Sequence, residues 1–444
     1  MSARRFRPYP AYKDSGVEWL GEIPAHWEVR RFKHLASLNP ESLGEDTDPG
    51  LEIVYVDIGG VDSLGRIVER EPLTFASAPS RARRLVRGGD VIVSTVRTYL
   101  RAIAPINDPE PNLVVSTGFA VVRPADDLTT EYAAYALRAP YFVERVVANS
   151  KGVSFPAINE SEMATYALAV PPAHEQRAIA AFLDRETARI DALVAKKERL
   201  IKLLQEKRTA LITRAVTKGL DHSVPMKDSG VEWLGEIPAH WEVKRLKFLM
   251  TEPLKYGANE AAELTDPELP RYIRITDIRD DGILRDDTFR SIPEDVAAPY
   301  LLSEGDLLFA RSGATVGKTF RYEPSWGRAA HAGYLIRARL DERRADSRFV
   351  LYFTQSEAYW DWLLSSFIQA TIQNVSAERY ASLLIPLPPL REQELIVERL
   401  QAAVVQLEDL VAKVREAIDR LKELRTALIS AAVTGKIDVR EEVA

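Results

Sequence analysis

The chain carries a long internal repeat, which constrains its fold more than any other feature. KDSGVEWLGEIPAHWEVRRFKHL begins at Lys13, KDSGVEWLGEIPAHWEVKRLKFL begins at Lys227, and 20 of these 23 positions are identical. A repeat of this kind in a chain of 444 residues predicts two copies of one folded part rather than a single core. These two stretches are called the entry segments below.

A second repeat closes each half and predicts a long helix there. HEQRAIAAFL and RTALITRAVTKG, which begin at 174 and 208, return as REQELIVERL and RTALISAAVTGK, which begin at 391 and 425. No Pro or Gly interrupts residues 174–218, and the pattern predicts a helix of about 40 residues, or about 60 Å, in each half.

Apolar residues in both helices recur on alternating steps of three and four, which is a heptad seam. They are Leu183, Ile190, Val194, Ile201, Leu204 and Leu211 in the first half, and Val397, Leu400, Val404, Leu407, Val411, Val414, Ile418, Leu421 and Leu428 in the second. Lys197, Arg208 and Arg425 are polar interruptions. The length favours a coiled coil of the two helices over a stripe that packs on each helix's own domain.

The segments between the repeats differ in sequence but share one pattern. VIVSTV, LVVSTGFAVVR, LLFAR and AGYLIRARL are typical of strands, whereas EYAAYALRAPYFVERVVAN and SRFVLYFTQSEAYWDWLLSSF are typical of helices. Gly-Asp precedes a strand in both halves, at Gly89-Asp90 and Gly305-Asp306. We therefore predict a mixed α/β chain with two domains of the same fold, at 1–170 and 222–387, and long helices within 171–221 and 388–444.

Composition limits the location and the partners of the chain. The net charge is −6 and there is no cysteine, so thiolate metal sites and disulfides are excluded. The first residues lack the apolar stretch of a signal peptide, and no apolar run could span a bilayer, so we expect a cytoplasmic protein without membrane contact. Because no segment is strongly basic, affinity for DNA would have to come from local clusters or from a partner subunit.

The ordered set of motifs resembles the specificity subunits of type I restriction–modification systems. It comprises the entry segment, the Gly-Asp strand, the Pro-Pro junction with its Glu-Gln pair, and the helix that ends in RTALI, all present twice. The first junction, AVPPAHEQ, departs slightly from the second, IPLPPLREQ. The resemblance covers essentially the whole chain.

This resemblance implies a fold and a set of partners. Two target-recognition domains are expected, joined by two long helices in an antiparallel coiled coil with approximate two-fold symmetry. Each domain would read one half of a bipartite, gapped target in double-stranded DNA, and the helices would measure the spacer. The subunit would be non-catalytic and hold no cofactor. Two methylation subunits with S-adenosylmethionine and two ATP- and Mg-dependent restriction subunits would supply adenine methylation and cleavage.

Basic stretches at the Gly-Asp strands are the first candidates for DNA contact, because they join cations with polar and aromatic side chains. In the first half these residues are Arg81, Arg83, Arg84, Arg97, Thr98, Tyr99 and Arg101. In the second half they are Arg311, Ser312, Thr315, Lys318 and Arg321. The alternative interpretation is a solvated charged face.

A second pair of loops offers amides and hydroxyls that can read base edges. Its candidates are Lys151 and Ser154 in the first half and Gln369, Thr371 and Gln373 in the second. Turn formation and helix capping use the same residue types and are the alternative. Arg274, in RYIRITDI, is a further candidate, although it can equally belong to the exposed face of a strand.

Two other classes of function were weighed. GATVGKT at 313–319 imitates a phosphate-binding loop, but it has three residues between its glycines where that loop requires four. The six histidines form no metal-binding spacing, and a structural hydrogen bond is expected for His26 and His240, which occupy equivalent repeat positions. A coiled-coil adaptor that binds proteins without DNA specificity is the main alternative function.

Overall fold

The computed structural model describes residues 6–279, 282–365 and 374–443, which form two compact units. Unit 1 comprises the described parts of Met1–Lys197 and Glu416–Ala444, and unit 2 those of Glu198–Arg415. The long helices α4 (Ala173–Lys218) and α9 (Leu390–Val433), of 46 and 44 residues, contribute one part to each unit. The two predicted helices are therefore confirmed, and the division at 170, 221 and 387 stays a prediction.

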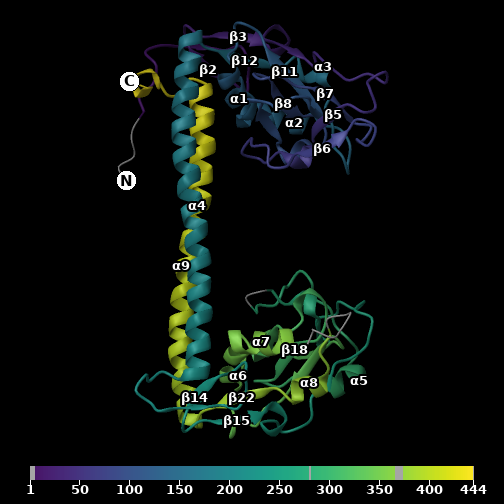
Figure 1. Ribbon diagram of the computed structural model, residues 1–444, viewed down its shortest axis with the longest axis vertical. Coiled ribbons are helices and arrows are strands. Elements are labelled where there is room, and N and C mark those ends of the chain that lie inside the picture. Colours follow the sequence, from purple (N-terminus) through teal and green to yellow (C-terminus); the bar gives the residue numbers. More distant parts are fainter. Residues whose placement is uncertain (1–5, 280–281, 366–373, 444) are drawn as a thin grey trace. The chain divides into compact units, whose positions relative to one another are not determined.

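Unit 1 contains two four-stranded sheets. The first is antiparallel, with the order β4 (Ala36–Leu38), β11 (Phe119–Pro124), β8 (Val91–Ser94) and β9 (Ile103–Pro105). The second has the order β6 (Glu71–Thr74), β5 (Glu52–Val56), β10 (Leu113–Ser116) and β7 (Ala82–Leu85), with β5 and β10 parallel. Figure 1 labels β8 and β11 of the first sheet and β5, β6 and β7 of the second. Two strand pairs are β1 (Tyr12–Asp14) with β2 (Glu22–Pro24), and β3 (Glu28–Arg31) with β12 (Ala167–Val170).

Unit 2 repeats this plan, with a pair of strands in place of the second four-stranded sheet. Its antiparallel sheet has the order β16 (Lys255–Tyr256), β21 (Leu335–Ala338), β18 (Leu307–Ala310) and β19 (Thr319–Arg321). The parallel pair is β17 (Arg271–Ile273) with β20 (Ala329–His331), and the remaining pairs are β13 (Met226–Asp228) with β14 (Glu236–Pro238), and β15 (Glu242–Arg245) with β22 (Leu384–Leu387). The matching strand order confirms one fold for both halves.

The predicted helices of each domain are broken into shorter ones. Unit 1 has α1 (Thr130–Arg138), α2 (Pro140–Ala148) and α3 (Glu160–Met163). Ala139 is extended because Pro140 follows it, which ends α1. Unit 2 has α5 (Glu294–Ala297), α6 (Ser347–Phe353), α7 (Glu357–Ser365) and α8 (Ala377–Ala381). Among the described residues, no helix has both the length and the apolar character needed to cross a membrane.

The Gly-Asp motif fixes the central strand of each antiparallel sheet. Asp90 is buried and accepts two hydrogen bonds of 2.8 Å from the Arg123 guanidinium. Asp306 accepts bonds of 2.8 and 2.7 Å from Arg339 in the same way. The glycine before each aspartate has a φ near +90°, which turns the chain into the strand. A buried carboxylate therefore ties neighbouring strands together in both halves.

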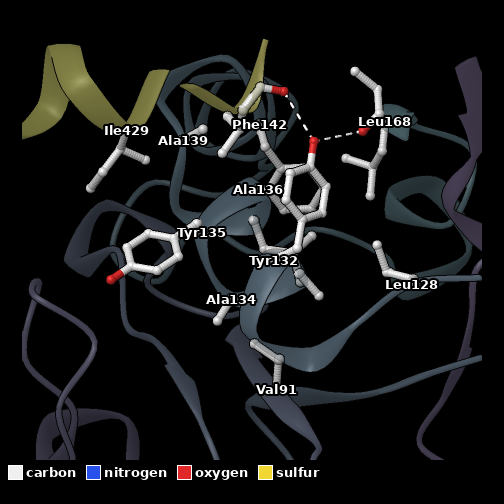
Figure 2. Close-up of a cluster of buried hydrophobic side chains, with 14 of the residues drawn as sticks. Val91, Leu128, Tyr132, Ala134, Tyr135, Ala136, Ala139, Phe142, Leu168 and Ile429 are labelled. Atoms are coloured by element: carbon white, nitrogen blue, oxygen red, sulfur yellow. Dashed lines mark hydrogen bonds between the residues drawn. The ribbon is translucent and has the colours of Figure 1, made fainter. Parts of the chain in front are cut away.

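Tyr132 of α1 lies at the centre of the main core of unit 1 (Figure 2). Its ring is fully buried, and its hydroxyl donates to the carbonyl oxygens of Ala169 at 2.8 Å and Val433 at 3.1 Å. Ile429 of α9 belongs to the same core. The end of α9 is thus packed into the first domain by both apolar and polar contacts.

The two long helices pair in an antiparallel register. In unit 1, Arg425 Nε donates to Asp191 Oδ1 at 3.1 Å, and in unit 2, Arg208 Nε lies 3.4 Å from Glu408 Oε1. Between these two contacts, the residue number rises along α4 and falls along α9 by the same amount, as it does in an antiparallel pair. Two of the three polar interruptions of the seam are thereby given partners.

The seam prediction is wrong at one position. Leu211 is 37% exposed, whereas its neighbour Ile212 is fully buried with Ala215 and Val216 in the main core of unit 2. The last turns of α4 therefore pack on the globular part of unit 2 rather than continue the predicted stripe. Most of the other seam residues are buried or half-buried.

The entry segments join the globular parts to the helices. Trp27 is fully buried, and its indole N–H donates to Glu175 Oε2 at 3.0 Å, while His26 Nε2 lies 2.6 Å from Glu175 Oε1. In unit 2, Trp241 and His240 make the same contacts to Glu392, at 3.1 and 2.8 Å. The structural hydrogen bond predicted for the two histidines is confirmed.

We call the contacts of each entry segment with the glutamate of the Glu-Gln pair, Glu175 or Glu392, the joint of that unit. The glutamine of the same pair completes the joint. Gln176 donates to the carbonyl oxygens of Asp127 and Pro171 and accepts from the Thr129 N–H at 2.8 Å. Gln393 is fully buried and makes the equivalent bonds to Pro388 and to the Asp346 N–H. The pair therefore satisfies backbone groups that would otherwise be buried without partners.

We expect Glu175→Ala to lower the free energy of unfolding of unit 1 by about 3 kcal/mol, because it leaves buried donors of Trp27 and Tyr9 without an acceptor. Glu392→Ala should cost less, about 1–2 kcal/mol, because its side chain is 29% exposed against 2% for Glu175. Urea denaturation monitored by tryptophan fluorescence measures both. Glu18→Ala, at an exposed position, is the control, and equal losses at Glu18 and Glu175 would contradict the joint.

Candidate nucleic-acid interface

Two loops of unit 1 that the sequence treated separately meet at one tip. The first follows β8, and the second precedes α3. Isolated β-bridges join Val96 to Ala157 and Lys151 to Ala157, and the Ile158 N–H donates to the Thr95 carbonyl at 2.9 Å. The structure thus brings the candidates Arg97, Tyr99, Lys151 and Ser154 together as exposed side chains. This group of loops is called the unit 1 tip.

The unit 1 tip combines a cation with exposed apolar side chains. Arg97 Cζ lies 4.8 Å from the centroid of the Phe155 ring, which is a cation–π contact. Tyr99 and Phe155 are more than half exposed and Val153 is fully exposed. Exposed apolar side chains that gather in this way are typical of surfaces that bind another molecule.

Most other arginines of the predicted basic cluster already hold a carboxylate. The pairs are Arg81 with Asp57 at 2.8 Å, Arg84 with Glu160 at 3.2 Å and Arg101 with Glu144 at 2.7 Å. The Tyr55 hydroxyl bond and the Asp57 charge raise the pKa of Arg81 above its ordinary value. Arg83 lies over the Phe75 ring instead. Unlike Arg81, Arg84 and Arg101, the side chains of Arg97 and Lys151 meet no carboxylate at ion-pair distance within the described residues.

Thr98 lies outside the exposed surface of the tip. It is 2% exposed, and its hydroxyl forms a 2.8 Å hydrogen bond with that of Ser150. The sequence could not show that Thr98 is buried while Tyr99 is exposed, because this difference arises in the short turn η3 (Thr98–Leu100), which the pattern did not predict. Its placement gives Thr98 a role in holding the two loops together.

Unit 2 has a corresponding tip with different side chains. Ser312 bridges to Asn374, and the Val375 N–H donates to the Arg311 carbonyl at 2.9 Å, as Ile158 does in unit 1. Arg311 Cζ lies 4.7 Å from the Tyr256 ring centroid, and its Nε donates to Asn374 at 3.2 Å. The candidates Gln369, Thr371 and Gln373 lie outside the described residues.

Two candidates of unit 2 are tied into its structure. Arg274 makes bonds of 2.9 and 2.6 Å to the buried Asp277 and caps the turn η5 (Ile275–Asp277). Arg321, on β19, is 13% exposed and binds Glu323 and the Ser347 hydroxyl. The sequence pattern could not predict these contacts, because it does not show whether the side chain of an arginine forms an ion pair within the fold.

The GATVGKT stretch does not have the geometry of a phosphate-binding loop. It forms the short turn η7 (Gly313–Thr315) and then enters strand β19, whereas a phosphate-binding loop leads into a helix whose N-terminus faces the phosphates. The Gly317 carbonyl accepts a bond of 2.7 Å from the buried Tyr359 hydroxyl. Thr315 and Lys318 therefore belong to a loop that packs on α7, and their contact with DNA stays a prediction.

Phe155 and Tyr256 were not predicted as parts of the interface. Each ring lies under an arginine of another segment. Phe155 comes 58 residues after Arg97, and Tyr256 comes 55 residues before Arg311. The available signal was an aromatic residue in or near a turn-rich loop, which alone does not indicate a partner. No cluster of histidine and acidic residues suited to a metal occurs in the described part of the chain.

Arg274→Ala should lower the free energy of unfolding of unit 2 by about 2 kcal/mol, because it leaves the buried Asp277 carboxylate without its cation. Arg97→Ala should stay within about 0.5 kcal/mol of the unchanged protein, because its side chain is exposed. Urea denaturation followed by circular dichroism compares them. Similar losses for the two variants would contradict the division into structural and available arginines.

Comparison with known proteins gives consistent relatives. A family model described as the type I restriction modification DNA specificity domain matches residues 81–203 and 238–420. The type I restriction enzyme StySPI specificity subunit of Salmonella potsdam is 22% identical over 321 residues, which are 71% of this chain and 67% of the relative. The putative MjaX specificity subunit of Methanocaldococcus jannaschii is 22% identical over 448 residues, 95% of this chain and 96% of the relative.

Solved structures show the same fold. A chain from a study of complex assembly and conformational transition in a type I R-M system has a TM-score of 0.74 and 23% identity, covering 93% of this chain and 98% of its own. The crystal structure of the HsdS subunit from Thermoanaerobacter tengcongensis has a TM-score of 0.51 and 22% identity, covering 94% and 98%.

Proposed function

The chain belongs to the type I restriction modification DNA specificity family, and from this premise we propose that each globular part reads one half of a bipartite, gapped DNA target. The subunit itself is non-catalytic, as specificity subunits are, and the alternative of an adaptor without DNA specificity is not favoured by this membership. Methylation and cleavage would be performed by other subunits of the complex.

The observation that carries the proposal is the contrast between joints and tips. The joints use the same residues in both halves, with Trp27 on Glu175 and Trp241 on Glu392. The tips are built on the same backbone bridges but present different side chains, Arg97 with Phe155 in one and Arg311 with Tyr256 in the other. Two readers of the same target would not need different tips, so different half-sites explain the contrast best.

The repeat also suggests the partners. Two equivalent joints would suit two copies of a methylation subunit that carries S-adenosylmethionine, and two restriction subunits that use ATP and Mg would complete the complex. Trp27 and Trp241 are fully buried, so they act in packing rather than as a docking surface. Trp19 is half-buried and stacks on Tyr141, with ring centroids 5.3 Å apart.

The proposed function predicts a single methylation phenotype. Expressing the chain with its methylation subunit should produce adenine methylation at one gapped motif, and omitting this chain should abolish it. Replacing residues 36–170 by the corresponding segment of another specificity subunit should change one half of that motif and leave the other. Long-read sequencing of methylated DNA measures both. Methylation that persists without the chain, or a replacement that changes both halves, would contradict the proposal.

We also propose that the helix pair sets the spacer, which an insertion in both helices tests. Three heptads placed between Lys197 and Glu198 and three between Ile418 and Asp419 would keep the antiparallel seam in register and lengthen each helix by about 32 Å. The preferred spacer should grow by about nine base pairs, close to one DNA turn, so both half-sites keep nearly the same facing.

Two controls separate spacing from damage. A single heptad in each helix shifts the half-sites by about three base pairs and turns them out of phase, so methylation should fall. Three heptads in α4 alone leave its partner helix short and should destabilise the protein in urea. A stable double insertion that methylates the original spacer would refute the spacing role.

A further inference from the structure

Arg97 occupies a backbone conformation for which unit 2 uses glycine. The φ of Arg97 is +54°, and that of the corresponding Gly313 is +76°. The correspondence follows from the hydrogen bonds, because the Leu100 N–H donates to the Arg97 carbonyl at 2.9 Å and the Val316 N–H to the Gly313 carbonyl at 3.1 Å. Left-handed φ values disfavour residues with a side chain, and they gather at functional sites. Unit 1 therefore carries a cation at a position that favours glycine.

The surrounding loops hold this cation in place. The Arg97 N–H donates to the Pro156 carbonyl at 2.8 Å, next to the β-bridge of Val96 with Ala157. The guanidinium lies over the Phe155 ring. Stacking on a ring restrains the guanidinium and leaves the N–H donors at its edge for another partner. No carboxylate among the described residues uses those donors.

The surroundings of Arg97 fit a base edge better than a phosphate. Tyr99, Leu100, Val153 and Phe155 are between 37% and 101% exposed, so the cation stands in an apolar surface. Base edges in the major groove offer apolar contacts such as the thymine methyl group, whereas phosphates offer charge and hydrogen-bond acceptors but no apolar contact. Guanine presents two acceptors, O6 and N7, whose spacing matches the guanidinium fork.

We propose that Arg97, positioned by Phe155, reads a guanine in the half-site of unit 1 through paired hydrogen bonds to O6 and N7. This rests on the proposed function, because it requires unit 1 to face DNA. Phe155 is a positioning residue, since it acts by restraining the guanidinium. Gly313 gives unit 2 no counterpart of this reader, so the requirement applies to one half-site.

The decisive variant is Arg97→Gly, which gives unit 1 the residue that unit 2 already has. Because glycine suits the left-handed backbone, the melting temperature should be unchanged or higher. Methylation mapping of the complex should show one G·C position of one half-site losing about 10- to 100-fold of its discrimination, with the other half unchanged. Arg70→Gly, at an exposed arginine of the same unit that pairs with Glu110, is the matched control and should leave the motif unchanged.

Phe155→Leu keeps an apolar side chain but removes the ring. It should weaken discrimination at the same guanine by about 3- to 10-fold and leave the remaining positions unchanged, which a purely structural role would not do. Binding of the complex to the matched DNA and to a sequence with that guanine replaced gives an independent readout.

Three results would overturn the inference. The first is an Arg97→Gly variant with unchanged motif and affinity, and the second is a change at a position without guanine. The third is weaker binding to all sequences equally, with the salt dependence of log K reduced by about one unit, which identifies a phosphate contact. If the unchanged complex yields no gapped motif, the proposed function fails first, and this result is distinct from a motif that survives Arg97→Gly.

Discussion

The buried carboxylate at the start of each long helix is the contact on which the rest of the structure depends. Glu175 is 2% exposed and binds Trp27, His26 and Tyr9 at once. A buried carboxylate without its donors would be costly, so the entry segment and the helix start depend on each other. The adjoining Gln176 extends the same network to the backbone before α1. One dipeptide thus orients the helix, the entry segment and the domain core together.

This arrangement separates what is repeated from what differs. Repeated residues lie in the joints, in the Gly-Asp strand starts and in the helix ends, where burial and hydrogen bonding restrict every side chain. Residues that differ lie at the tips, where the backbone is fixed by bridges such as that of Val96 with Ala157 while the side chains project outward. A rigid support with variable exposed residues is how binding surfaces diversify without loss of stability.

Periodicity predicted the features that depend on local sequence. The two long helices, the mixed α/β domains and the buried strands followed from apolar spacing, since burial of one face imposes it. The seam failed at Leu211, where contacts with the globular part replace the helix partner. The basic cluster was predicted as a group of similar cations, yet Arg81 and Arg101 pair with acids 24 and 43 residues away. Such partners depend on the fold, so the availability of Arg97 became visible only with the contacts in place.

The likeness of the two joints creates an ambiguity during folding. Trp27 finds Glu175 across 148 residues, but Glu392 offers the same acceptor at the start of the other helix. Loop closure favours the nearer carboxylate by only about 0.8 kcal/mol, because the entropy of closure grows slowly with length. Correct pairing must therefore come from contacts peculiar to each half, such as those of the Tyr132 hydroxyl with the carbonyl oxygens of Ala169 and Val433. We infer that packing in each domain core determines which helix start binds the entry segment of that half.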